Sequence, residues 1–594
     1  MARREGFCVT LVAVAILCLA WVPSVVEATW IDPDTPEDVM KTQTVDKTSN
    51  LELVFSDEFN TPGRTFGDGK DPRWTALDKN DYTNAALHYY SPDNARTNDE
   101  GELVIQSQPK NTEVVGFNDR KGEKEVVTKH FKSAMIQSWN KFCFTGGVIE
   151  TKVILPGKAH VGGLWPAFWI LGNLARHTYV GSAMHVWPWS SNQCSTKSFY
   201  SQKFNACSKM THYGLHPGQG RGAPEIDIFE VQPGKIKRNH GPFLRSPVGQ
   251  PFQSASFQVA PGRPSNRPGS GYWPGPGQWY DGIEGGNKSA LNILYYGDYN
   301  HFWGDVNPAK MDYWSDAISY NRQLDTTHFE TAHVYRLEWD VPTEEKDGYL
   351  RWYLDEELIV SMNGTGLKAS SDGAVEISSE PSSIILNTAI SSQWGFPGEC
   401  PANCPCKKYD CNSKDWTDVC GFSEGFCDMM KKKGGPQYKI DWVRVYQDPS
   451  KPEQKVGCST PERPTRQYIE AHPNLYKMPE DEVPLKHIQR GQGSCTRGES
   501  DACGGSEHGT CTAANVCQCK EGWTGPGCLA HAGHDAIDWD AADKITDIGF
   551  IPPTAAPMVL MVALGVFVVG ILLATLIGKE RLDGWVSGGY TPLK

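Results

Sequence analysis

Three carboxylates within six residues are the most informative feature of this sequence. Glu225, Asp227 and Glu230 lie in the segment Glu-Ile-Asp-Ile-Phe-Glu, separated by apolar residues that favour a β-strand. Two carboxyl groups held a few ångströms apart break and form glycosidic bonds, one as a nucleophile and one as an acid and base. The segment therefore predicts chemistry on a sugar.

The spacing of these carboxylates requires an irregular strand if all three are to act together. Alternate residues of a regular strand share a face, which puts Glu225 and Asp227 on one face and Glu230 on the other. A β-bulge adds one residue to a strand and is a device found beside active sites. We therefore predict a bulge that brings Glu230 beside Glu225. A surface strand with an acidic face is the alternative that the spacing leaves open.

Each carboxylate has a predicted role. Glu225 is the nucleophile, which attacks the anomeric carbon and forms a glycosyl-enzyme. Glu230 is the acid/base, which protonates the departing oxygen and then removes a proton from the incoming acceptor. Asp227 assists by hydrogen-bonding the nucleophile. Three carboxylates this close cannot all stay ionised at ordinary cost, so one pKa should be raised.

The surrounding sequence predicts an all-β catalytic domain. From Leu51 to Gln447, short runs of alternating apolar residues are broken by Gly, Pro, Asn and Asp. Examples are Gly147–Leu155, Tyr349–Leu354 and Ile440–Tyr446. Many short strands separated by turn residues are typical of a β-sandwich or jelly roll.

The length and the net charge of the chain argue against a protein of one ordinary domain and against a nucleic-acid-binding protein. A chain of 594 residues is too long for one ordinary domain. The net charge of −13 argues against a nucleic-acid partner. The 20 Trp and 22 Tyr residues are many for this length, and aromatic rings can stack on sugar rings as well as fill a core.

The two ends of the chain predict a protein tethered to a membrane. Residues 1–28 have a basic start, an apolar stretch at Phe7–Trp21 and a small-residue cleavage site, typical of a signal peptide; an uncleaved anchor is the alternative. Residues 558–577 are apolar and uncharged over 20 positions, enough to cross a bilayer as a helix. Basic residues follow at once, which places the tail, 578–594, in the cytosol.

These ends together predict a single-pass type I membrane protein of the secretory pathway. Its catalytic domain would be lumenal or extracellular. The endoplasmic reticulum, Golgi, vacuole and plasma membrane all fit this prediction.

Cysteines in that oxidising compartment should pair as disulfides. Cys8 and Cys18 leave with the signal peptide, so 16 of the 18 cysteines remain. One cluster lies between Cys400 and Cys427, where disulfides are favoured over a metal site. Another forms a compact module over residues 495–528, which is too small to hold a core without cross-links. Its six cysteines alone allow 15 connectivities.

The remaining segments are interpreted as connections and modification sites. Residues 448–494 are rich in Pro and in charge and are interpreted as a linker, and residues 529–557 as a short stalk. Two Asn-x-Ser/Thr sequons, at Asn287 and Asn363, are candidate glycosylation sites.

The carboxylate segment resembles the core motif of glycoside hydrolase family 16, the clan of β-glucanases and laminarinases. In that family Glu-x-Asp-x-x-Glu lies on a bulged strand of a β-jelly roll, a concanavalin-like sandwich. The resemblance covers residues 51–447. Further matches occur in order at Phe55–Asn60, Gly163–Gly172, His333–Trp339 and Ile440–Gln447.

That resemblance also implies how substrate is bound. Trp165 and Trp169 of the Gly163–Gly172 match are the expected substrate-binding residues. No cofactor is implied. Some members of the family bind a structural calcium ion, and this chain shows no oxygen-rich loop that would require one.

A narrower resemblance is to the fungal proteins associated with β-glucan synthesis. Its matches are Gln137–Gly147, Gly220–Asp227, Ser256–Pro261 and Cys458–His472. That subfamily is linked to making β-1,6-linked glucan, which implies a glucan-remodelling transglycosylase more than a digestive hydrolase. The fungal proteins are anchored by an N-terminal segment, whereas this chain has a C-terminal span and an added module. Organelle, partner and linkage specificity are therefore not carried over.

The module at residues 495–528 resembles an epidermal-growth-factor-like domain, through its ending Cys-x-Cys-x-x-Gly-Trp-x-Gly-x-x-Cys. The resemblance implies the disulfides Cys495–Cys511, Cys503–Cys517 and Cys519–Cys528. A spacer is favoured over a receptor ligand as the role of the module, and its protein partner is unknown.

Other tryptophans are further candidates for stacking on sugars. Trp273, Trp279 and Trp303 follow the catalytic strand in expected loops. Trp187 and Trp189 lie in an insertion that is a candidate wall of the substrate site.

Together these features predict a membrane-anchored, β-glucan-active retaining glycosidase or transglycosylase that forms or remodels β-1,6 linkages or branches during glucan or cell-wall biosynthesis. The expected partners are β-glucan polysaccharide or oligosaccharide and, through the C-terminal helix, the membrane. One alternative is a laminarinase-like endo-β-1,3-glucan hydrolase. Another is a non-catalytic, receptor-like protein that binds glucan, which would not need the three carboxylates.

Overall fold

The computed structural model describes much of the chain between residues 30 and 531. The described residues are 30–81, 83–118, 123–183, 186–193, 202, 204–205, 215–216, 218–232, 251–262, 280, 282–292, 300–303, 312–370, 375–392, 394–396, 409–471, 473–476, 495–500, 502–521, 523–524, 528 and 530–531. The predicted signal peptide and the predicted membrane helix and tail lie outside them. None of the helices in these ranges is long and apolar enough to cross a bilayer.

The chain forms two compact units. The larger contains residues 1–202, 221–466 and 478–481, and the smaller contains residues 203–220, 467–477 and 482–594. The larger unit holds the carboxylate segment, and the smaller holds the cysteine-rich module.

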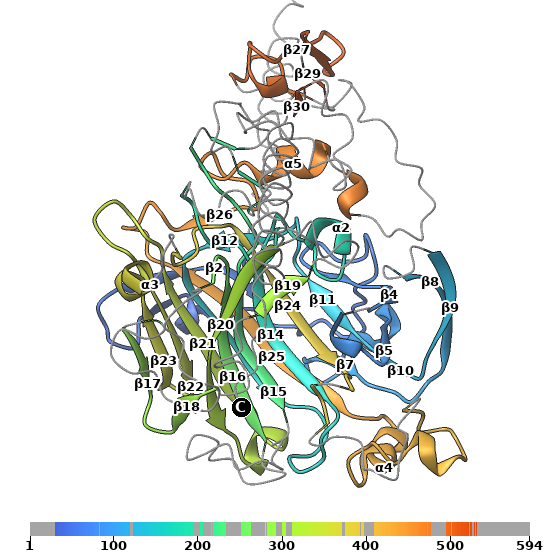
Figure 1. The fold of residues 1–594 in the computed structure, drawn as a ribbon. Coiled ribbons are helices and arrows are strands. Elements are labelled where there is room, and N and C mark those ends of the chain that lie inside the picture. Colours follow the sequence, from blue (N-terminus) through green and yellow to red (C-terminus); the bar gives the residue numbers. More distant parts are fainter. Residues whose placement is uncertain are drawn as a thin grey trace, which may run out of the picture. The chain divides into compact units, whose positions relative to one another are not determined.

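The larger unit is a sandwich of two antiparallel β-sheets (Figure 1). The first sheet has ten strands: β1 (Lys41–Gln43), β2 (Asn50–Asp57), β6 (Ala95–Thr97), β7 (Leu103–Gln106), β13 (Gly147–Ile154), β17 (Ile283–Gly285), β21 (His333–Asp340), β22 (Tyr349–Leu354), β23 (Glu357–Asn363) and β25 (Gln437–Gln447). Its order is β1-β2-β25-β13-β21-β22-β23-β17, and β7 joins β6 to β25.

The second sheet has eleven strands and carries the carboxylates. They are β3 (Thr75–Ala76), β11 (Met135–Gln137), β12 (Cys143–Thr145), β14 (Trp165–Gly172), β15 (Glu225–Gln232), β16 (Phe252–Val259), β18 (Ser289–Leu291), β19 (Asn300–Trp303), β20 (Asp312–Gln323), β24 (Ser382–Ala389) and β26 (Lys455–Val456). The main order is β18-β20-β16-β15-β14-β24-β11-β3. The carboxylate strand β15 is therefore a central strand.

Smaller elements surround the sandwich. A three-stranded sheet contains β4 (Lys79–Asn80), β5 (His88–Tyr90) and β10 (Phe131–Ser133), and β8 (Thr112–Asn118) pairs with β9 (Glu123–Lys129). The helices of the described ranges are short: α2 (Val180–Ala183), α3 (Gly364–Ser370), α4 (Phe426–Lys431) and α5 (Thr465–Ala471).

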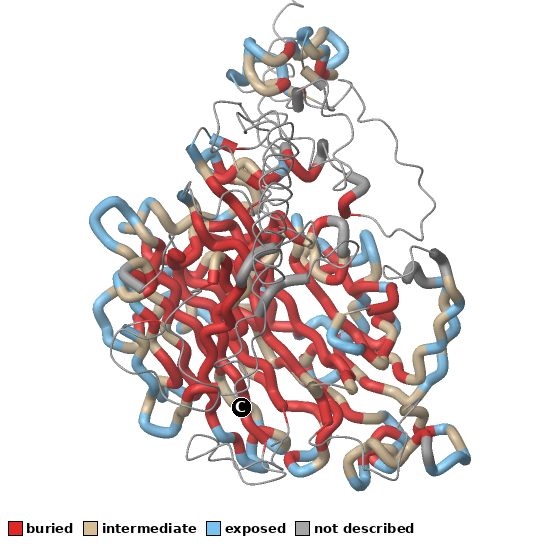
Figure 2. Tube along the Cα trace, in the orientation of Figure 1, coloured by how far each residue is buried: buried red, intermediate tan, exposed pale blue. Residues whose placement is uncertain are grey.

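Alternation along the strands explains why the two sheets close on each other. In β13, Ile149, Thr151 and Val153 are buried, whereas Glu150 and Lys152 between them are only partly buried. Both sheets contribute to one hydrophobic core, in which Phe229 of β15 packs against Tyr335 of β21 with ring centroids 4.4 Å apart. Figure 2 shows the strands of both sheets as largely buried, with exposed residues in the connections. The predicted all-β sandwich is thus present, because burial of these apolar faces drives the sheets together.

The sandwich includes residues on both sides of the predicted range 51–447. Strand β1 precedes it, and part of the predicted linker, 448–494, packs onto the second sheet through β26, which pairs with β12. A disulfide between Cys143 and Cys458 fixes the same segment. Within the segment interpreted as a linker, Arg463 is buried with its guanidinium 3.5 Å from Glu380.

The predicted cysteine cluster between Cys400 and Cys427 is described in part. Cys411 and Cys427 form a disulfide. Cys411 and Phe426 pack with Leu164 in a small hydrophobic cluster of their own. Because Leu164 directly precedes β14, this insertion lies beside the first residues of β14. The cysteines at positions 400, 404 and 406 lie outside the described residues.

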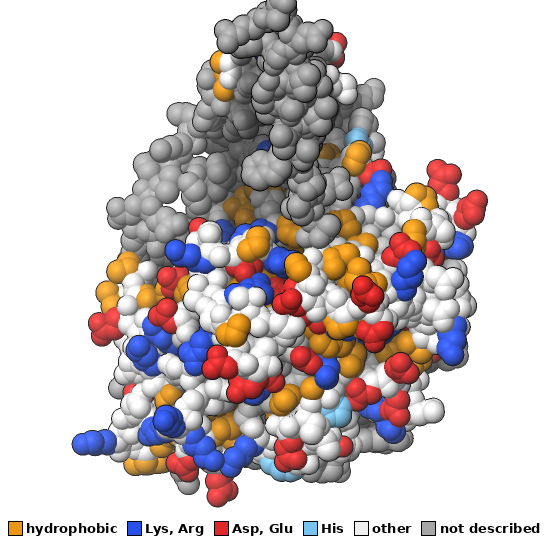
Figure 3. Space-filling view, turned by 180° about the vertical axis from the view of Figure 1, so that it is seen from behind, with side chains coloured by type: hydrophobic (Ala, Val, Ile, Leu, Met, Phe, Trp, Pro, Cys, Tyr) orange, Lys and Arg blue, Asp and Glu red, His pale blue; other side chains and the backbone are white. Residues whose placement is uncertain are grey.

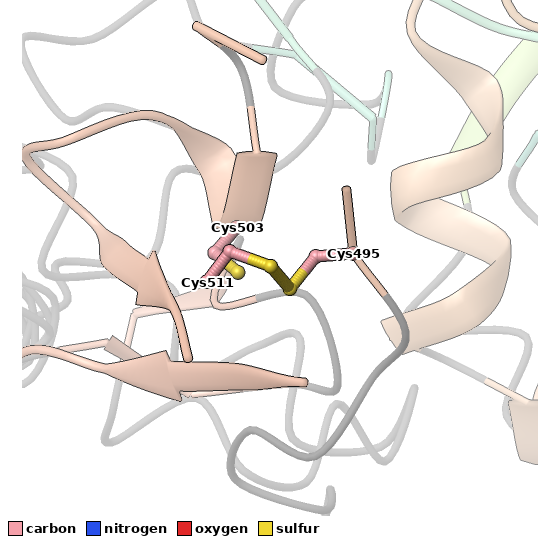
Figure 4. Close-up of side chains that lie close together, drawn as sticks. All are labelled: Cys495, Cys503 and Cys511. Carbon is pink, nitrogen blue, oxygen red and sulfur yellow. A yellow bond between two sulfur atoms is a disulfide. The ribbon is translucent and has the colours of Figure 1, made fainter. Parts of the chain in front are cut away.

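Three disulfides hold the module at residues 495–528. They join Cys495 to Cys511, Cys503 to Cys517 and Cys519 to Cys528, which is the pairing implied by the resemblance to epidermal-growth-factor-like domains. Figure 4 shows the Cys495–Cys511 bond with Cys503 beside it. These sulfurs lie close together, but a disulfide sulfur is not the thiolate that binds a metal.

The surface shown from behind carries acidic, basic and apolar side chains interspersed over the described residues (Figure 3). Both predicted glycosylation sites are exposed: Asn287 lies between β17 and β18, and Asn363 ends β23. Their exposure would give a glycosylating enzyme access, and the modification itself stays a prediction.

Candidate active site

The carboxylate strand β15 contains the predicted bulge. Asp227 and Glu230 each pair with a serine of β16, and between them Ile228 and Phe229 lie opposite the single residue Ala255. The register with β14 shifts at the same place. The bulge therefore turns Glu230 to the face that carries Asp227.

Apolar packing explains why the strand bulges at this position. Ile228 and Phe229 are both buried in the core between the sheets. Two consecutive core residues cannot be accommodated in a regular strand, because its side chains alternate between faces. The backbone oxygen of Asp227 accepts a hydrogen bond of 2.9 Å from the Trp352 indole of the first sheet, which satisfies a buried carbonyl.

Glu225 accepts two side-chain hydrogen bonds. The indole Nε1 of Trp187 donates to one carboxylate oxygen at 2.6 Å, and the amide of Gln258 donates to the other at 2.7 Å. The same amide donates to Asp227 at 3.2 Å. The carboxyl groups of Glu225 and Asp227 also lie within hydrogen-bonding reach of each other.

Glu230 has fewer side-chain hydrogen bonds than Glu225. The indole Nε1 of Trp165 donates to its Oε1 at 3.1 Å. Its second oxygen, Oε2, is buried and accepts no hydrogen bond from the residues that the structure describes. One oxygen of Glu230 is therefore unsatisfied among the described residues.

Burial raises the pKa of all three carboxyl groups, and neighbouring carboxylate charge raises it further at Glu225 and Glu230. Removal from water raises the pKa of Glu225 well above its usual value, and the charges of Asp227 and Glu230 raise it further. Burial raises the pKa of Asp227 to about 7. Burial and then the charge of Asp227 raise the pKa of Glu230 well above its usual value. The cluster thus keeps a proton near neutral pH, as predicted from the spacing.

Hydrogen bonding favours Glu230 as the group that holds this proton. Neutral donors stabilise the charged form of a carboxylate. Glu225 accepts two such bonds of 2.6 and 2.7 Å, whereas Glu230 accepts one of 3.1 Å. The environment therefore suits Glu225 to act as an anion and Glu230 to act as an acid.

The charge of Asp227 should set the alkaline limit of any activity. A general acid works only while protonated, so activity falls as pH rises through the pKa of Glu230. In Asp227→Asn the repulsive charge is gone, the pKa of Glu230 falls, and the alkaline limb of kcat/KM should move about one pH unit lower. The pH profile of the residual activity measures this shift. Asp355→Asn, on the first sheet, is the control, and an unmoved limb in Asp227→Asn would reject Glu230 as the acid.

The two tryptophans of the family-like motif have different environments. Trp165 is partly exposed and stacks on Trp394, with ring centroids 5.4 Å apart and planes at 26°. Trp169 is only 5% exposed, and its Nε1 donates to Asn387 at 2.8 Å. The edge of its ring also meets His177 at 4.4 Å. Trp165 can therefore meet a sugar beside Glu230, whereas Trp169 is covered and its role in substrate binding stays a prediction.

The other candidate tryptophans are only partly described. Trp187 donates a hydrogen bond to Glu225, whereas Trp189 is buried against Ala260, and the wall that they were predicted to form stays a prediction. Trp273 and Trp279 lie outside the described residues. The backbone of Trp303 lies in β19, and its side chain lies outside the description.

Gln258 and Trp394 are candidate site residues that the sequence did not indicate. Gln258 follows Ser256 on the same face of β16, and pairing with Glu225 brings it to the carboxylates. Trp394 follows β24, which pairs with β14 so that Ala389 lies opposite Trp165. For Gln258 the signal was alternation toward the carboxylate face, which can be used only when the strand order is known, whereas Trp394 lies in a turn where alternation gives no signal.

Two solved structures of β-glucanases resemble this chain at low identity. The catalytic domain of an endo-1,3-beta-glucanase (laminarinase) from Thermotoga petrophila is 20% identical, covering 68% of this chain and 100% of that chain, with a TM-score of 0.34. The endo-beta-1,3-glucanase from Pyrococcus furiosus is 18% identical, covering 70% of this chain and 98% of that chain, with a TM-score of 0.35.

Similarity to curated proteins is more extensive. The beta-glucan synthesis-associated protein KRE6 of Saccharomyces cerevisiae is 30% identical over 473 residues, which are 76% of this chain and 54% of that protein. SKN1 of the same yeast is 30% identical over 470 residues, 76% of this chain and 50% of that protein. This chain spans about half the length of the curated relatives it matches.

A family model matches most of the chain. The family is described as beta-glucan synthesis-associated protein SKN1/KRE6/Sbg1, and its model matches residues 20–406 and 421–482. These ranges contain all three carboxylates, both motif tryptophans and the segment around Cys458. The chain therefore belongs to the SKN1/KRE6/Sbg1 family of beta-glucan synthesis-associated proteins.

Proposed function

We propose that this chain is a β-glucan-active glycosidase or transglycosylase that works by double displacement with retention of anomeric configuration. The observation that carries the proposal is the bulge in β15, which gathers Glu225, Asp227 and Glu230 on one face. Family membership supports β-glucan as the substrate, since the relatives are described as associated with beta-glucan synthesis.

In the first half of the proposed reaction, Glu225 attacks the anomeric carbon of a bound glucan. The bond from that carbon to the leaving oxygen breaks as the bond to Glu225 forms. Glu230 gives its proton to the leaving oxygen and becomes an anion. Glu225 loses its negative charge when it forms the glycosyl-enzyme, and Glu230 gains one when it gives up its proton. The three carboxyl groups are therefore never all ionised at the same time.

In the second half, an acceptor hydroxyl attacks the glycosyl-enzyme. Glu230 takes the proton from this hydroxyl, and the bond to Glu225 breaks as the new glycosidic bond forms. Asp227, which shares a hydrogen bond with Glu225, helps this group to leave as an anion. If water is the acceptor the result is hydrolysis, and if a sugar hydroxyl is the acceptor the result is transfer.

We propose transfer to glucan, with new β-1,6 linkages or branches, as the main reaction. The purified full-length protein in detergent is incubated with reduced laminari-oligosaccharides, and products are separated by size and linkage. Longer products with new β-1,6 linkages are expected. Shorter β-1,3 fragments alone, at every acceptor concentration, would indicate a laminarinase-like hydrolase. Binding without turnover would indicate a glucan receptor.

We also propose that the sandwich and the cysteine-rich module lie outside the cytosol, as parts of a type I membrane protein. The disulfides at Cys143–Cys458, Cys411–Cys427 and in the module support an oxidising compartment. Protection of the folded domain from added protease in sealed vesicles, and its loss after detergent, would test this orientation.

A further inference from the structure

Two buried amide side chains lie on the carboxylate face beside Glu230. In β15, the core residue Val231 separates Glu230 from Gln232, so Glu230 and Gln232 share the face opposite the core. In β20, Tyr320 belongs to the core, so its neighbour Asn321 points to the opposite face. Both amides therefore belong to the same face as the carboxylates.

Strand pairing places these residues close to one another. Glu230 pairs with Ser254 of β16, which in turn pairs with Asn321 of β20. Neighbouring strands lie about 4.8 Å apart, so Asn321 is roughly 10 Å from Glu230 in the same row. Gln232 is two residues along β15, at about 7 Å. The three side chains thus surround one patch of the sheet.

The two amides have no partners within the described residues. Gln232 is 1% exposed and Asn321 is 7% exposed, and neither the oxygen nor the nitrogen of either amide makes a hydrogen bond there. Glu230 Oε2 is buried and unpaired in the same patch. Buried polar groups are nearly always paired in folded proteins, so such a group needs an explanation.

Neighbouring polar residues on this face show that pairing is possible. The hydroxyls of Ser256 and Ser319 are 2.7 Å apart, and Asn292 donates to Ser319 at 3.0 Å. These residues form the row next to Asp227, and their polar groups are satisfied within the fold. On β15, β16 and β20, the unpaired side-chain groups of this face are those of Glu230, Gln232 and Asn321; across the sheet, Gln137 of β11 is also buried and unpaired among the described residues.

We propose that Gln232 and Asn321 form a subsite for hydroxyl groups of the acceptor sugar. An amide offers a donor and an acceptor side by side, and so does each hydroxyl of a glucose unit. Along β15, Gln232 follows Glu230 on the side away from Glu225. A sugar bound by Gln232 would therefore face Glu230, the proposed acid/base, and its unpaired oxygen Oε2. This inference rests on the proposed function, because it names the binding groups for the second half of that reaction.

The subsite makes a prediction that separates it from a structural role. An unpaired buried amide costs stability, so an apolar side chain of similar size should raise the unfolding temperature and also weaken ligand binding. The variants are Gln232→Met and Asn321→Leu. The matched control is Gln253→Leu: Gln253 is equally buried and unpaired, but it lies on the core face with Ala255.

Binding and stability are measured on the full-length protein. In a Glu225→Gln background, calorimetry with laminari-oligosaccharides should show affinity lowered about tenfold by Gln232→Met and by Asn321→Leu. Gln253→Leu should leave the affinity unchanged. All three substitutions should raise the unfolding temperature of the free protein by a few degrees. In the Glu225-containing protein, the two site variants should also lower the ratio of transfer to hydrolysis.

Each outcome tests the proposed subsite separately from the proposed glycosidase or transglycosylase reaction. Unchanged affinity in both site variants overturns the subsite even if the parent protein forms new linkages. A protein without turnover whose binding still depends on Gln232 and Asn321 keeps the subsite and rejects the reaction. A parent protein that binds no oligosaccharide rejects the subsite, and so does a fall in unfolding temperature for both variants.

Discussion

Replacing Glu225 by glutamine is expected to lower turnover of β-glucan oligosaccharides by about a thousandfold or more. The amide has nearly the shape of the carboxylate but cannot attack the anomeric carbon. The effect should appear in kcat, because the loss concerns the transition state rather than binding. Rates are measured with reduced laminari-oligosaccharides, and folding is checked by the unfolding temperature.

Glu230→Gln is the matched comparison for this variant. A glycosyl donor whose leaving group departs as a stable anion needs no proton from an acid. With such a donor, Glu230→Gln should therefore regain the first step of the reaction, formation of the glycosyl-enzyme. Glu225→Gln should not, because the missing group is the nucleophile itself. Full activity in Glu225→Gln would reject the assignment, and rescue of Glu225→Gln without rescue of Glu230→Gln would mean that the two roles are exchanged.

The second large effect is expected at a buried ion pair behind the carboxylate strand. Arg221, four residues before Glu225, is fully buried and donates to both oxygens of Glu380 at 3.0 and 2.7 Å. It also donates to the hydroxyl of Thr465 at 2.8 Å. The cluster thus joins the segments that precede β15 and β24 to the segment that follows β26.

Arg221→Met should lower the free energy of unfolding of the sandwich by about 3–5 kcal/mol, because Glu380 is left as a buried carboxylate without its main partner. Denaturant unfolding followed by tryptophan fluorescence measures the change. The double variant Arg221→Met/Glu380→Met should recover much of the loss, since removal of both charges leaves no unpaired ion.

An exposed ion pair provides the control for this prediction. Lys41 and Glu52 are 2.8 Å apart with side chains 77% and 51% exposed, so Lys41→Ala should change stability little. A similar small effect of Arg221→Met would show that the buried cluster is not a structural support. A double variant as unstable as the single one would show that Arg221 acts through something other than the charge of Glu380.

The loop of Trp187 connects this cluster to the nucleophile. Arg463 donates to Asn192 at 2.8 Å and lies 3.5 Å from Glu380. Asn192 follows Trp187 in the same described segment, and Trp187 donates to Glu225. The segment after β25 therefore contacts the loop that carries Trp187.

The sequence by itself was enough to predict the sandwich, the three carboxylates and the bulge. The sandwich follows from apolar residues that alternate along strands, whereas the bulge was predicted because Glu230 can share a face with Glu225 and Asp227 only if the strand is irregular. The disulfide pairing of the module came from resemblance to a known domain. The link between Trp165 and substrate also came from such a resemblance, and the structure adds its hydrogen bond to Glu230.

Only the tertiary structure decided which other side chains surround the carboxylates. Gln258 reaches Glu225 because β16 pairs with β15 in one register, and Trp394 reaches Trp165 because β24 pairs with β14. The segment near Arg463 was interpreted as a linker because it is rich in Pro and in charge, yet Arg463 is buried and paired with Glu380 inside the fold. Strand order, register and buried ion pairs join residues far apart in the chain, and composition and periodicity carry no record of such contacts.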